Sequence, residues 1–394
     1  MPTRVPAVDG KTAPLVVVGG GFGGLSTALQ LAANAASTPE HPPVLLIEPQ
    51  ERFLFLPLLY ELLSGELRRW EIAPAYGELL AGRGVAWLQQ RVESINTDAR
   101  SLRTSDGREL HYSALVIATG GKPLHTGIAG VEEHCLGFRS LHDVERLQQL
   151  VETLRQRQRP LQRLVIVGAG ASGVELACKL ADLLDGAAVI ELVEQGGELL
   201  PNSRSFNREQ AQRALLQRDI RLRTSTRVVA VHADRLELQC GENQPIEPLA
   251  VDAVIWTGGV SGSVPTFIPA LPLDPRGRLR CEATLQVIGV EHCYALGDAA
   301  ASPHPATAQV AYQQASCVAA NLMRDRQGKV PQPFHWNDLG EMLGLGIGQA
   351  TITGMGLTLA GPAAYQLRRL AYLARLPGLQ HQLKVAGGWL THWL

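Results

Sequence analysis

Two glycine motifs with the same spacing stand far apart in the chain. The first is Gly19-x-Gly21-x-x-Gly24 and the second is Gly168-x-Gly170-x-x-Gly173. In such a motif the first glycine permits a tight turn, the second lets the backbone approach a pyrophosphate, and the third lets a helix pack against a strand. The N-terminus of that helix offers unpaired N–H groups and a favourable dipole to the phosphates. Each motif therefore predicts a cradle for a dinucleotide.

Both motifs have the surroundings that such a cradle needs. An apolar run, LVVV or LVIV, precedes each motif and is typical of a buried parallel strand, and a helical pattern follows. A second apolar run then ends in an acidic residue, Glu48 in the first case and Glu194 in the second. A carboxylate there accepts hydrogen bonds from ribose hydroxyls. One such motif is equally compatible with an ordinary glycine turn, but two complete units favour two nucleotide sites.

Three further strand ends complete the pattern. ALVIATGG (114–121) and DAVIWTGG (252–259) end in Thr-Gly-Gly, and CYALGDAAA (293–301) ends a strand in Gly-Asp. In this order the motifs resemble the two-dinucleotide flavoprotein oxidoreductases. The resemblance implies FAD in the first cradle and a nicotinamide dinucleotide in the second, with Gly120 and Gly258 among the cofactor-binding residues. It also implies that Asp298 hydrogen-bonds the ribityl chain of the flavin.

The predicted fold is α/β, with two Rossmann-like dinucleotide-binding domains and a C-terminal amphipathic helical segment. We expect an FAD-binding domain at 1–121 and 276–330, interrupted by an NAD(P)H-binding domain at 122–275. A C-terminal membrane-association domain is expected at 331–394. Short loops rich in Gly and Pro mark these crossings.

The six cysteines restrict the electron acceptor. They form no CxxC or CxxxxC pair, which fits a reducing compartment and disfavours a disulfide reductase. Sulfide:quinone reductases of this fold use a cysteine pair with one member late in the chain, and no cysteine follows Cys317. We also predict no metal site. A different acceptor is therefore expected.

The segment HPATAQVAYQQASCVAANL (304–322) follows the Gly-Asp strand end. It resembles the AQxAxQ signature of the type II NADH dehydrogenases, which are NAD(P)H:quinone oxidoreductases. The resemblance implies that Ala308 and Gln309 begin a helix directed at the pyrimidine end of the flavin. Gln313 lies four residues on, on the same helical face. Neutral amides suit a quinone carbonyl, although a polar helix surface is the alternative explanation.

Two acidic residues of the second cradle bear on the reaction. Glu175 lies in the first turn of a helix, where the helix dipole stabilises a carboxylate. The family resemblance adds a role in lining the approach to the nicotinamide and quinone pockets, so we expect Glu175 to act with the two glutamines in catalysis. Glu194 suits a free ribose 2′-hydroxyl and repels a 2′-phosphate, which favours NADH. Arg204 and Arg208 nearby could soften that preference, and NADPH stays open.

Two further segments contain no catalytic or cofactor-binding motif. RFLFLPLLYELLSGEL (52–67) resembles the family's flavin-side segment, with an amphipathic core helix as the alternative. From Met342 to Leu394 the chain has no Asp or Glu but keeps four basic residues, namely Arg368, Arg369, Arg375 and Lys384. Two short amphipathic helices there, with Trp389 and Trp393 near the end, indicate a monotopic membrane anchor. The alternative is a helical hairpin packed on the protein's own surface or on a second subunit, and the family often places a dimer contact there.

The composition excludes other classes of protein. A net charge of −1 and an aromatic content of 5% disfavour nucleic-acid binding. No window of 18 consecutive apolar residues is present, and the first residues lack the apolar core of a secretory signal. We therefore expect a peripheral protein on the cytoplasmic face of a plasma or thylakoid membrane.

The sequence thus predicts a non-proton-pumping, FAD-dependent enzyme that transfers electrons from NAD(P)H to a membrane quinone. The quinone is expected to be of the plastoquinone or ubiquinone type, or demethylphylloquinone. The overall likeness of segments such as GLGIGQATITGMGLTLAGPAAYQLRRLAYL indicates the cyanobacterial and plastid branch, which includes demethylphylloquinone reductases. Two alternatives stay open: a soluble reductase of ferredoxin or dye type, and a redox-sensing flavoprotein without significant turnover.

Overall fold

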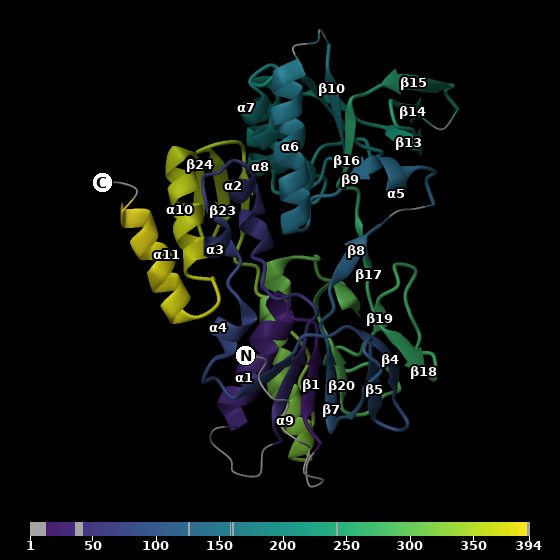
Figure 1. Cartoon of the computed structure of the whole chain (residues 1–394), viewed down its shortest axis with the longest axis vertical. Coiled ribbons are helices and arrows are strands. Elements are labelled where there is room, and N and C mark those ends of the chain that lie inside the picture. Colours follow the sequence, from purple (N-terminus) through teal and green to yellow (C-terminus); the bar gives the residue numbers. More distant parts are fainter. Residues whose placement is uncertain are drawn as a thin grey trace. The chain divides into compact units, whose positions relative to one another are not determined.

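Figure 1 shows a computed structural model of the protein. The structure describes residues 13–35, 42–124, 127–157, 159, 161–241 and 243–391. The chain forms two compact units, each assembled from three separate stretches of sequence. Unit 1 comprises the described parts of Met1–Leu54, Ala73–Lys122 and Val260–Asn337. Unit 2 comprises those of Phe55–Ile72, Pro123–Gly259 and Asp338–Leu394.

The main sheet of unit 1 has five parallel strands in the order β20-β7-β1-β2-β3. Its strands are β1 (Leu15–Val18), β2 (Val44–Ile47), β3 (Val85–Leu88), β7 (Ala114–Ile117) and β20 (Cys293–Ala295). The apolar runs predicted four of these strands, and only β3 was not predicted. Helices α1 (Phe22–Ala35) and α9 (Ala308–Arg326) pack against each other.

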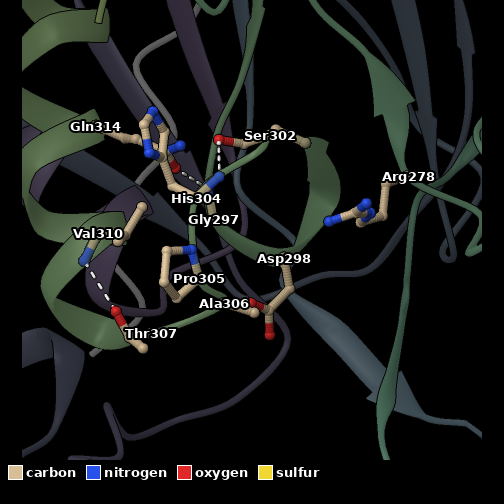
Figure 2. A pocket seen from close by; sticks show the side chains of 11 residues that line it. Arg278, Gly297, Asp298, Ser302, His304, Pro305, Ala306, Thr307, Val310 and Gln314 are labelled. Carbon is tan, nitrogen blue, oxygen red and sulfur yellow. Dashed lines mark hydrogen bonds between the residues drawn. The ribbon is translucent and has the colours of Figure 1, made fainter. Parts of the chain in front are cut away.

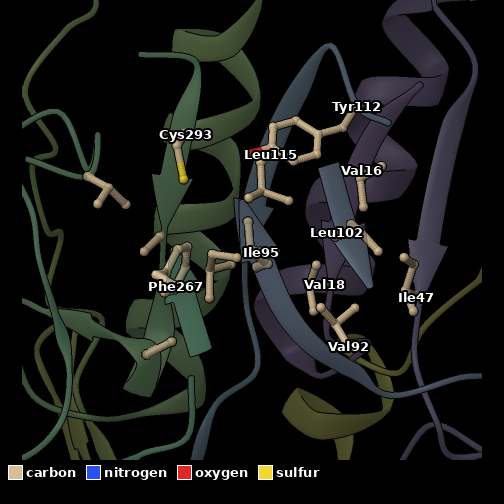
Figure 3. Packing of buried hydrophobic residues seen from close by; sticks show 14 of the residues in the cluster. Val16, Val18, Ile47, Val92, Ile95, Leu102, Tyr112, Leu115, Phe267 and Cys293 are labelled. Atoms are coloured by element: carbon tan, nitrogen blue, oxygen red, sulfur yellow. The ribbon is translucent and has the colours of Figure 1, made fainter. Parts of the chain in front are cut away.

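A second sheet of unit 1 has the order β18-β4-β5-β6. Its strands are β4 (Val92–Asn96), β5 (Ser101–Thr104), β6 (Glu109–His111) and β18 (Thr266–Ile268). Buried aliphatic side chains from both sheets form one core, in which Val16, Ile95 and Leu102 lie together (Figure 3). The main sheet and the second sheet thus share one hydrophobic core. The glycine motif of unit 1 follows the carboxyl end of β1. The smaller elements of the unit are α4 (Tyr76–Leu80), β17 (Val260–Gly262), β19 (Leu279–Arg280), η2 (Gly297–Ala299) and β21 (Ala300–Ala301).

Unit 2 repeats the plan with a parallel sheet in the order β12-β11-β10-β16-β9. Its strands are β9 (Cys135–Leu136), β10 (Arg163–Val167), β11 (Val189–Val193), β12 (Arg221–Arg223) and β16 (Ala253–Trp256). The helices of this part are α5 (Val131–His134), α6 (Leu141–Arg157), α7 (Ala171–Leu184) and α8 (Ser205–Leu216). An antiparallel meander of β13 (Thr226–Val231), β14 (Arg235–Cys240) and β15 (Ile246–Ala250) shares a core with the sheet.

The end of the chain also belongs to unit 2. An antiparallel sheet of β22 (Glu341–Gly344), β23 (Ala350–Gly354) and β24 (Leu357–Gly361) precedes helices α10 (Pro362–Leu373) and α11 (Leu379–Thr391). The sequence predicted the two helices but not the three strands before them. The segment Phe55–Ile72 forms three short helices in the same unit, η1 (Leu56–Leu58), α2 (Leu59–Leu63) and α3 (Arg69–Ile72). It is therefore not one amphipathic helix.

Candidate functional site

The two glycine turns have the same local geometry. Gly19 and Gly168 follow β1 and β10 with φ angles of +98° and +104°, a region that disfavours residues with a Cβ. A Cβ on Gly24 would collide with the carbonyl oxygen of Gly19, and a Cβ on Gly173 would collide with that of Gly168 in the same way. The third glycine therefore lets each helix start close against its turn.

The second glycine of each motif has a different environment. A Cβ added to Gly21 or to Gly170 would meet no atom within 4 Å. No contact among the described residues therefore requires glycine at these two positions. Open space at the start of α1 and α7 is what a bound pyrophosphate needs, since the first N–H groups of each helix are directed there.

The acids at the strand ends brace the turns. Glu48 Oε2 accepts a hydrogen bond from the Gly20 N–H at 2.6 Å, and its Oε1 accepts one from the Gln50 N–H at 2.8 Å. Glu194 does the same in unit 2, with donors at Ala169 (2.8 Å) and Gly196 (2.7 Å). Burial raises the pKa of Glu48, although the two backbone donors oppose that effect. Each carboxylate oxygen keeps a lone pair with which it can accept a ribose hydroxyl.

The Thr-Gly strand ends differ between the two units. The Thr257 hydroxyl hydrogen-bonds the carbonyl oxygen of Val167 at 2.8 Å and so fixes the second turn. The equivalent Thr119 hydroxyl is buried and has no hydrogen-bond partner within the described part of the chain. Gly120 adopts a φ of +67°, whereas a Cβ on Gly258 would lie 3.2 Å from the Trp256 indole nitrogen.

A pocket lies at the end of β20 in unit 1 (Figure 2). It is lined by Gly297 and Asp298, by the loop from Ser302 to Thr307, and by Gln314 of α9. Gln314 is buried, and its Oε1 accepts a hydrogen bond from the Gly297 N–H at 2.7 Å. Its Nε2 is buried and finds no acceptor among the residues that the structure describes. A buried N–H group without a partner is costly, so a bound polar group at this pocket would stabilise it.

The two glutamines of the AQxAxQ segment hold a neighbouring stretch of chain. Gln313 Nε2 donates to the carbonyl oxygen of Asn337 at 2.8 Å, and its Oε1 accepts from the Asn337 N–H at 2.9 Å. Gln309 Oε1 accepts from the Trp336 indole N–H at 3.2 Å. Asn321, further along the same helical stripe, pairs with the backbone of Gln332. The structure thus shows a role for these side chains beyond a bare polar surface, and their assignment to a quinone stays a prediction.

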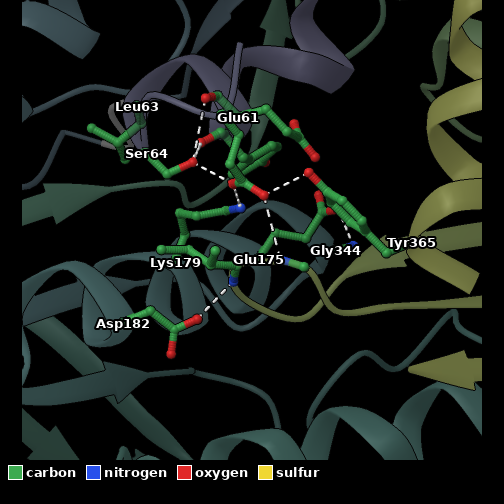
Figure 4. A network of polar contacts seen from close by, with 12 residues as sticks. Glu61, Leu63, Ser64, Glu175, Lys179, Asp182, Gly344 and Tyr365 are labelled. Carbon is green, nitrogen blue, oxygen red and sulfur yellow. Dashed lines mark hydrogen bonds and ion pairs between the residues drawn. The ribbon is translucent and has the colours of Figure 1, made fainter. Parts of the chain in front are cut away.

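Glu175 lies in a buried polar cluster of unit 2 (Figure 4). Its Oε1 accepts the Gly344 N–H at 2.6 Å and lies 3.4 Å from Nη2 of Arg368, on α10. Arg368 also pairs with Glu61 of α2, and the side chains of Arg368 and Glu61 are 1% and 2% exposed. Burial raises the pKa of Glu175 to about 7, although Arg368 and the Gly344 N–H oppose that effect.

A second group of the same cluster is centred on Glu66. The buried ammonium of Lys179 and the Ser64 hydroxyl both contact its carboxylate. The Tyr365 hydroxyl donates to Glu66 Oε1 at 2.5 Å. Burial opposes ionisation of Glu66, but the contacts with Lys179, Ser64 and Tyr365 outweigh it and lower the pKa.

The basic residues of the C-terminal segment do not all lie on a solvent-facing flank. Arg368 is the exception to that prediction, because it is buried against the carboxylates of Glu61 and Glu175. Trp389 Nε1 donates to Glu71 Oε1 at 2.7 Å, and Arg369 lies over the Trp389 ring at 4.2 Å. The segment without acidic residues therefore uses acids contributed by other parts of unit 2.

An apolar stripe on α10 and α11 is nevertheless exposed. Its leucines are Leu370 (58% exposed), Leu379 (67%), Leu383 (64%) and Leu390 (70%). No helix in the described part of the chain is both long enough and apolar enough to cross a bilayer. Trp393 and Leu394, part of the predicted aromatic edge, lie outside the described residues.

The arginines considered for a 2′-phosphate are engaged elsewhere. Arg204 Nη2 pairs with Asp338 at 2.8 Å, and Arg208 Nη1 pairs with Glu198 at 2.6 Å. Glu194 is thus the charged side chain that meets the second glycine turn directly. This arrangement is consistent with the predicted preference for NADH.

Sequence reasoning missed several residues of these sites. Gln314 stands beside Gln313 of the motif and has no signal of its own, and Arg368 lies on an amphipathic helix, where an arginine normally faces solvent. Glu61 lies in the segment 52–67, whose pattern marks no single residue for a role. The excess of acids in YELLSGELRRWE (60–71), set against the acid-free tail, is the one signal in the sequence that could have paired the two segments.

The residues of both glycine turns fit dinucleotide cofactors. In unit 1 the open space at Gly21 accompanies the acid at the end of β2, together with two buried groups that have no partner among the described residues, the Thr119 hydroxyl and the Gln314 Nε2. In unit 2 the open space at Gly170 accompanies Glu194. All six cysteines are free thiols. The geometry therefore supplies two nucleotide cradles and no disulfide.

Comparisons with known proteins agree with this geometry. Residues 13–315 match the family model described as pyridine nucleotide-disulphide oxidoreductase. The chain is 42% identical to demethylphylloquinone reductase NdbB of Synechocystis sp., covering 96% of this chain and 95% of that protein. It is 32% identical to the alternative NAD(P)H-ubiquinone oxidoreductase C1 of Arabidopsis thaliana, covering 97% and 81%.

The fold is also that of a solved structure. The structure of NDH2 from Plasmodium falciparum in complex with NADH superposes with a TM-score of 0.83 at 18% identity, covering 95% of this chain and 97% of that one. From the family match and the two sequence relatives, the chain belongs to the pyridine nucleotide-disulphide oxidoreductase family and, within it, to the type II NAD(P)H:quinone oxidoreductases.

Proposed function

We propose that the protein oxidises NAD(P)H and reduces a membrane quinone, with FAD as the resident cofactor. The observation that carries this proposal is the presence of two complete dinucleotide cradles in one chain, together with the named relatives. FAD, when bound, takes up a hydride from NAD(P)H and passes the electrons to the quinone.

The residues of unit 1 are assigned to FAD. The N–H groups at the start of α1, next to Gly21, would bind the pyrophosphate, and Glu48 would accept the ribose hydroxyls. Asp298 would hydrogen-bond the ribityl chain, with Gly120 and Ala308 close to the ring system. Gln309 and Gln313 are proposed to face the quinone, and the two residues that they hold, Trp336 and Asn337, would then form part of that site.

The residues of unit 2 are assigned to the nicotinamide cofactor. Gly170 and the start of α7 would bind its pyrophosphate, and Glu194 would accept the ribose 2′-hydroxyl, which favours NADH over NADPH. Gly258 would lie beside the nicotinamide end. Glu175 is proposed to line the approach to the reacting centre as a carboxyl group that exchanges a proton near neutral pH, in keeping with its raised pKa of about 7.

Among quinones, we propose a prenylated naphthoquinone. The support is that the relative with 42% identity is named a demethylphylloquinone reductase. The relative with 32% identity is named a ubiquinone oxidoreductase, which makes a benzoquinone the second candidate. Amide donors such as Gln309 and Gln313 suit the carbonyls of either ring, so these two side chains do not select between the two quinone types.

We further propose that α10 and α11 rest on the cytoplasmic surface of a membrane. The exposed leucines at positions 370, 379, 383 and 390 give these helices an apolar face that is otherwise in water. Arg375 and Lys384 would meet anionic headgroups at its edge. The competing occupant of the face is a second copy of the chain. Sedimentation in the absence of lipid and flotation with vesicles distinguish the two.

The function is tested with two half-reactions. The purified protein should be yellow, anaerobic NADH should bleach its flavin absorbance, and a prenylated naphthoquinone should restore the absorbance faster than a benzoquinone does. If no naphthoquinone or benzoquinone reoxidises the reduced protein, the acceptor assignment is refuted. In the Gly21→Val variant, blocked approach to the pyrophosphate should remove the flavin while NADH still binds.

A further inference from the structure

The residue that follows the first glycine is held in each unit at both its N–H and its carbonyl oxygen. In unit 1 the Gly20 N–H donates to Glu48 at 2.6 Å, and the Gly20 carbonyl oxygen accepts from the Tyr76 hydroxyl at 2.7 Å. In unit 2 the Ala169 N–H donates to Glu194 at 2.8 Å, and its carbonyl oxygen accepts from the Leu200 N–H at 3.0 Å. Both turns are therefore clamped at the same residue of the motif.

The two clamps differ in kind. The donor to the carbonyl is a side chain in unit 1 and the main chain in unit 2, so a point substitution can remove only the first. The residue at the turn differs accordingly. A Cβ on Gly20 would collide with the Tyr76 hydroxyl and lie 2.9 Å from Glu48 Cγ, whereas unit 2 accommodates the methyl group of Ala169. Position 20 thus requires glycine because the Tyr76 hydroxyl occupies the space that a Cβ would need.

Tyr76 is built to hold this position. It is the first residue of α4, it is 2% exposed, and its ring centroid lies 5.5 Å from that of Trp87. The Trp87 indole N–H in turn donates to the Glu48 carbonyl oxygen at 3.2 Å. Burial, with the nearby Glu48 carboxylate, raises the pKa of Tyr76 well above its usual value, so the hydroxyl stays protonated as a donor.

We propose that Tyr76 is a positioning residue of the adenosine diphosphate end of the FAD site. Its hydroxyl fixes the Gly20 carbonyl, which belongs to the same peptide group as the Gly21 N–H and so sets the direction of that N–H. Gly20 also donates its own N–H to Glu48, so the fixed residue holds the carboxylate in position. Preorganised donors and acceptors bind a ligand without a further ordering cost. This inference rests on the proposed function, because it takes the first cradle to be the FAD site.

The test is the dissociation constant of FAD for the full-length apoprotein, measured by quenching of flavin fluorescence. Tyr76→Phe deletes one hydroxyl and should weaken FAD binding about three- to tenfold, the equivalent of one hydrogen bond. The dissociation constant of NADH should not change, since the clamp in unit 2 is main chain. Tyr112→Phe is the matched control: it is a buried tyrosine of the same unit whose hydroxyl bonds the Asn96 carbonyl at 3.4 Å. It should leave FAD affinity unchanged.

Gly20→Ala provides a second variant should Tyr76→Phe fold poorly. The new methyl would displace the Tyr76 hydroxyl, so FAD binding should weaken at least about tenfold while NADH binding persists. The proposal is overturned if Tyr76→Phe lowers the melting temperature but leaves the FAD dissociation constant unchanged, or if it weakens FAD and NADH equally. Gly21→Val distinguishes a failure of the proposed function from a failure of this inference. Full retention of FAD in Gly21→Val contradicts the proposed function. Loss of FAD in Gly21→Val, combined with an unchanged FAD dissociation constant in Tyr76→Phe, contradicts only the role of Tyr76.

Discussion

Arg368 gives the sharpest test of how the C-terminal helices are attached to unit 2. Its guanidinium pairs with Glu61 and lies 3.4 Å from Glu175, and its Nη2 donates to the Pro57 carbonyl oxygen at 3.0 Å. Burial disfavours the charged form, but Glu61, Tyr372 and Glu175 outweigh it and raise the pKa of Arg368. Arg368→Met retains much of the side-chain volume and removes the charge.

The expected loss is large because two carboxylates are left buried without their cation. Removing one partner of a buried ion pair costs about 3–5 kcal/mol. Since about 1.4 kcal/mol is a factor of ten in an equilibrium constant, the equilibrium constant for local opening of α10 should rise roughly 10²- to 4 × 10³-fold. Unit 1 does not contain this pair, so its stability should not change.

Hydrogen exchange followed by mass spectrometry measures this opening directly, because protection reports the free energy of local unfolding. Peptides covering residues 362–373 should lose protection, and peptides covering β1 should not. Arg213→Met, an exposed arginine on α8 of the same unit, is the control and should leave both unchanged. Adding Glu61→Gln to Arg368→Met should restore part of the protection, since one uncompensated charge is removed.

The defect should also depend on pH. Arg368 lowers the pKa of Glu175, so its removal lets that pKa rise above about 7. Glu175 is then protonated at pH 6 and the defect should be smaller there than at pH 8. Protection of α10 within about threefold of the wild type, or no recovery in the double variant, would refute the ion-pair account of this attachment.

Three further outcomes are expected. The folded-state pKa of Glu175 is raised from 4.5 to about 7, so its contribution to stability is complete below pH 4.5 and is lost as the pH rises through about 7. Glu175→Gln should therefore flatten the decline of the denaturation midpoint between pH 5 and 8, and an unaltered slope would count against it. Glu194→Ser should raise the ratio of kcat/KM for NADPH to that for NADH, because a carboxylate that repels the 2′-phosphate is removed. Gln313→Leu should slow flavin reoxidation by quinone more than flavin reduction by NADH in stopped-flow experiments, and equal slowing would remove Gln313 from the acceptor site.

The parallel sheets could be predicted from the sequence because their signals are local. A continuous apolar run followed by GxGxxG specifies a strand, a turn and a helix within about 30 residues. Glu48 and Glu194 follow from the same pattern, one strand later. β3, whose VAWL has no glycine motif beside it, gave no such signal, nor did the three strands between Glu341 and Gly361.

The attachment of the tail could not be predicted because its signals lie far apart in the chain. Arg368 is a surface residue by every local criterion, since its helix is amphipathic and its neighbour is another arginine. It is buried only because Glu61 and Glu175, which come from two other segments, converge on it. An ion pair between residues so far apart in the chain leaves no pattern in either segment alone. A charged residue with no visible partner in its own segment is expected to face solvent.

The clamp at the glycine turns shows why a repeated motif need not be a repeated mechanism. Both turns fix the same residue of the motif, with an acid at its N–H, and the sequence displays that acid. On the other side the first turn uses the Tyr76 hydroxyl and the second uses the Leu200 N–H, and the sequence displays neither. Deleting one oxygen atom, as in Tyr76→Phe, can therefore weaken the cradle of unit 1. No side-chain substitution removes the corresponding donor in unit 2, because that donor is a main-chain N–H. Selective loss of flavin with retained NADH binding is the consequence that a shared motif alone would not predict.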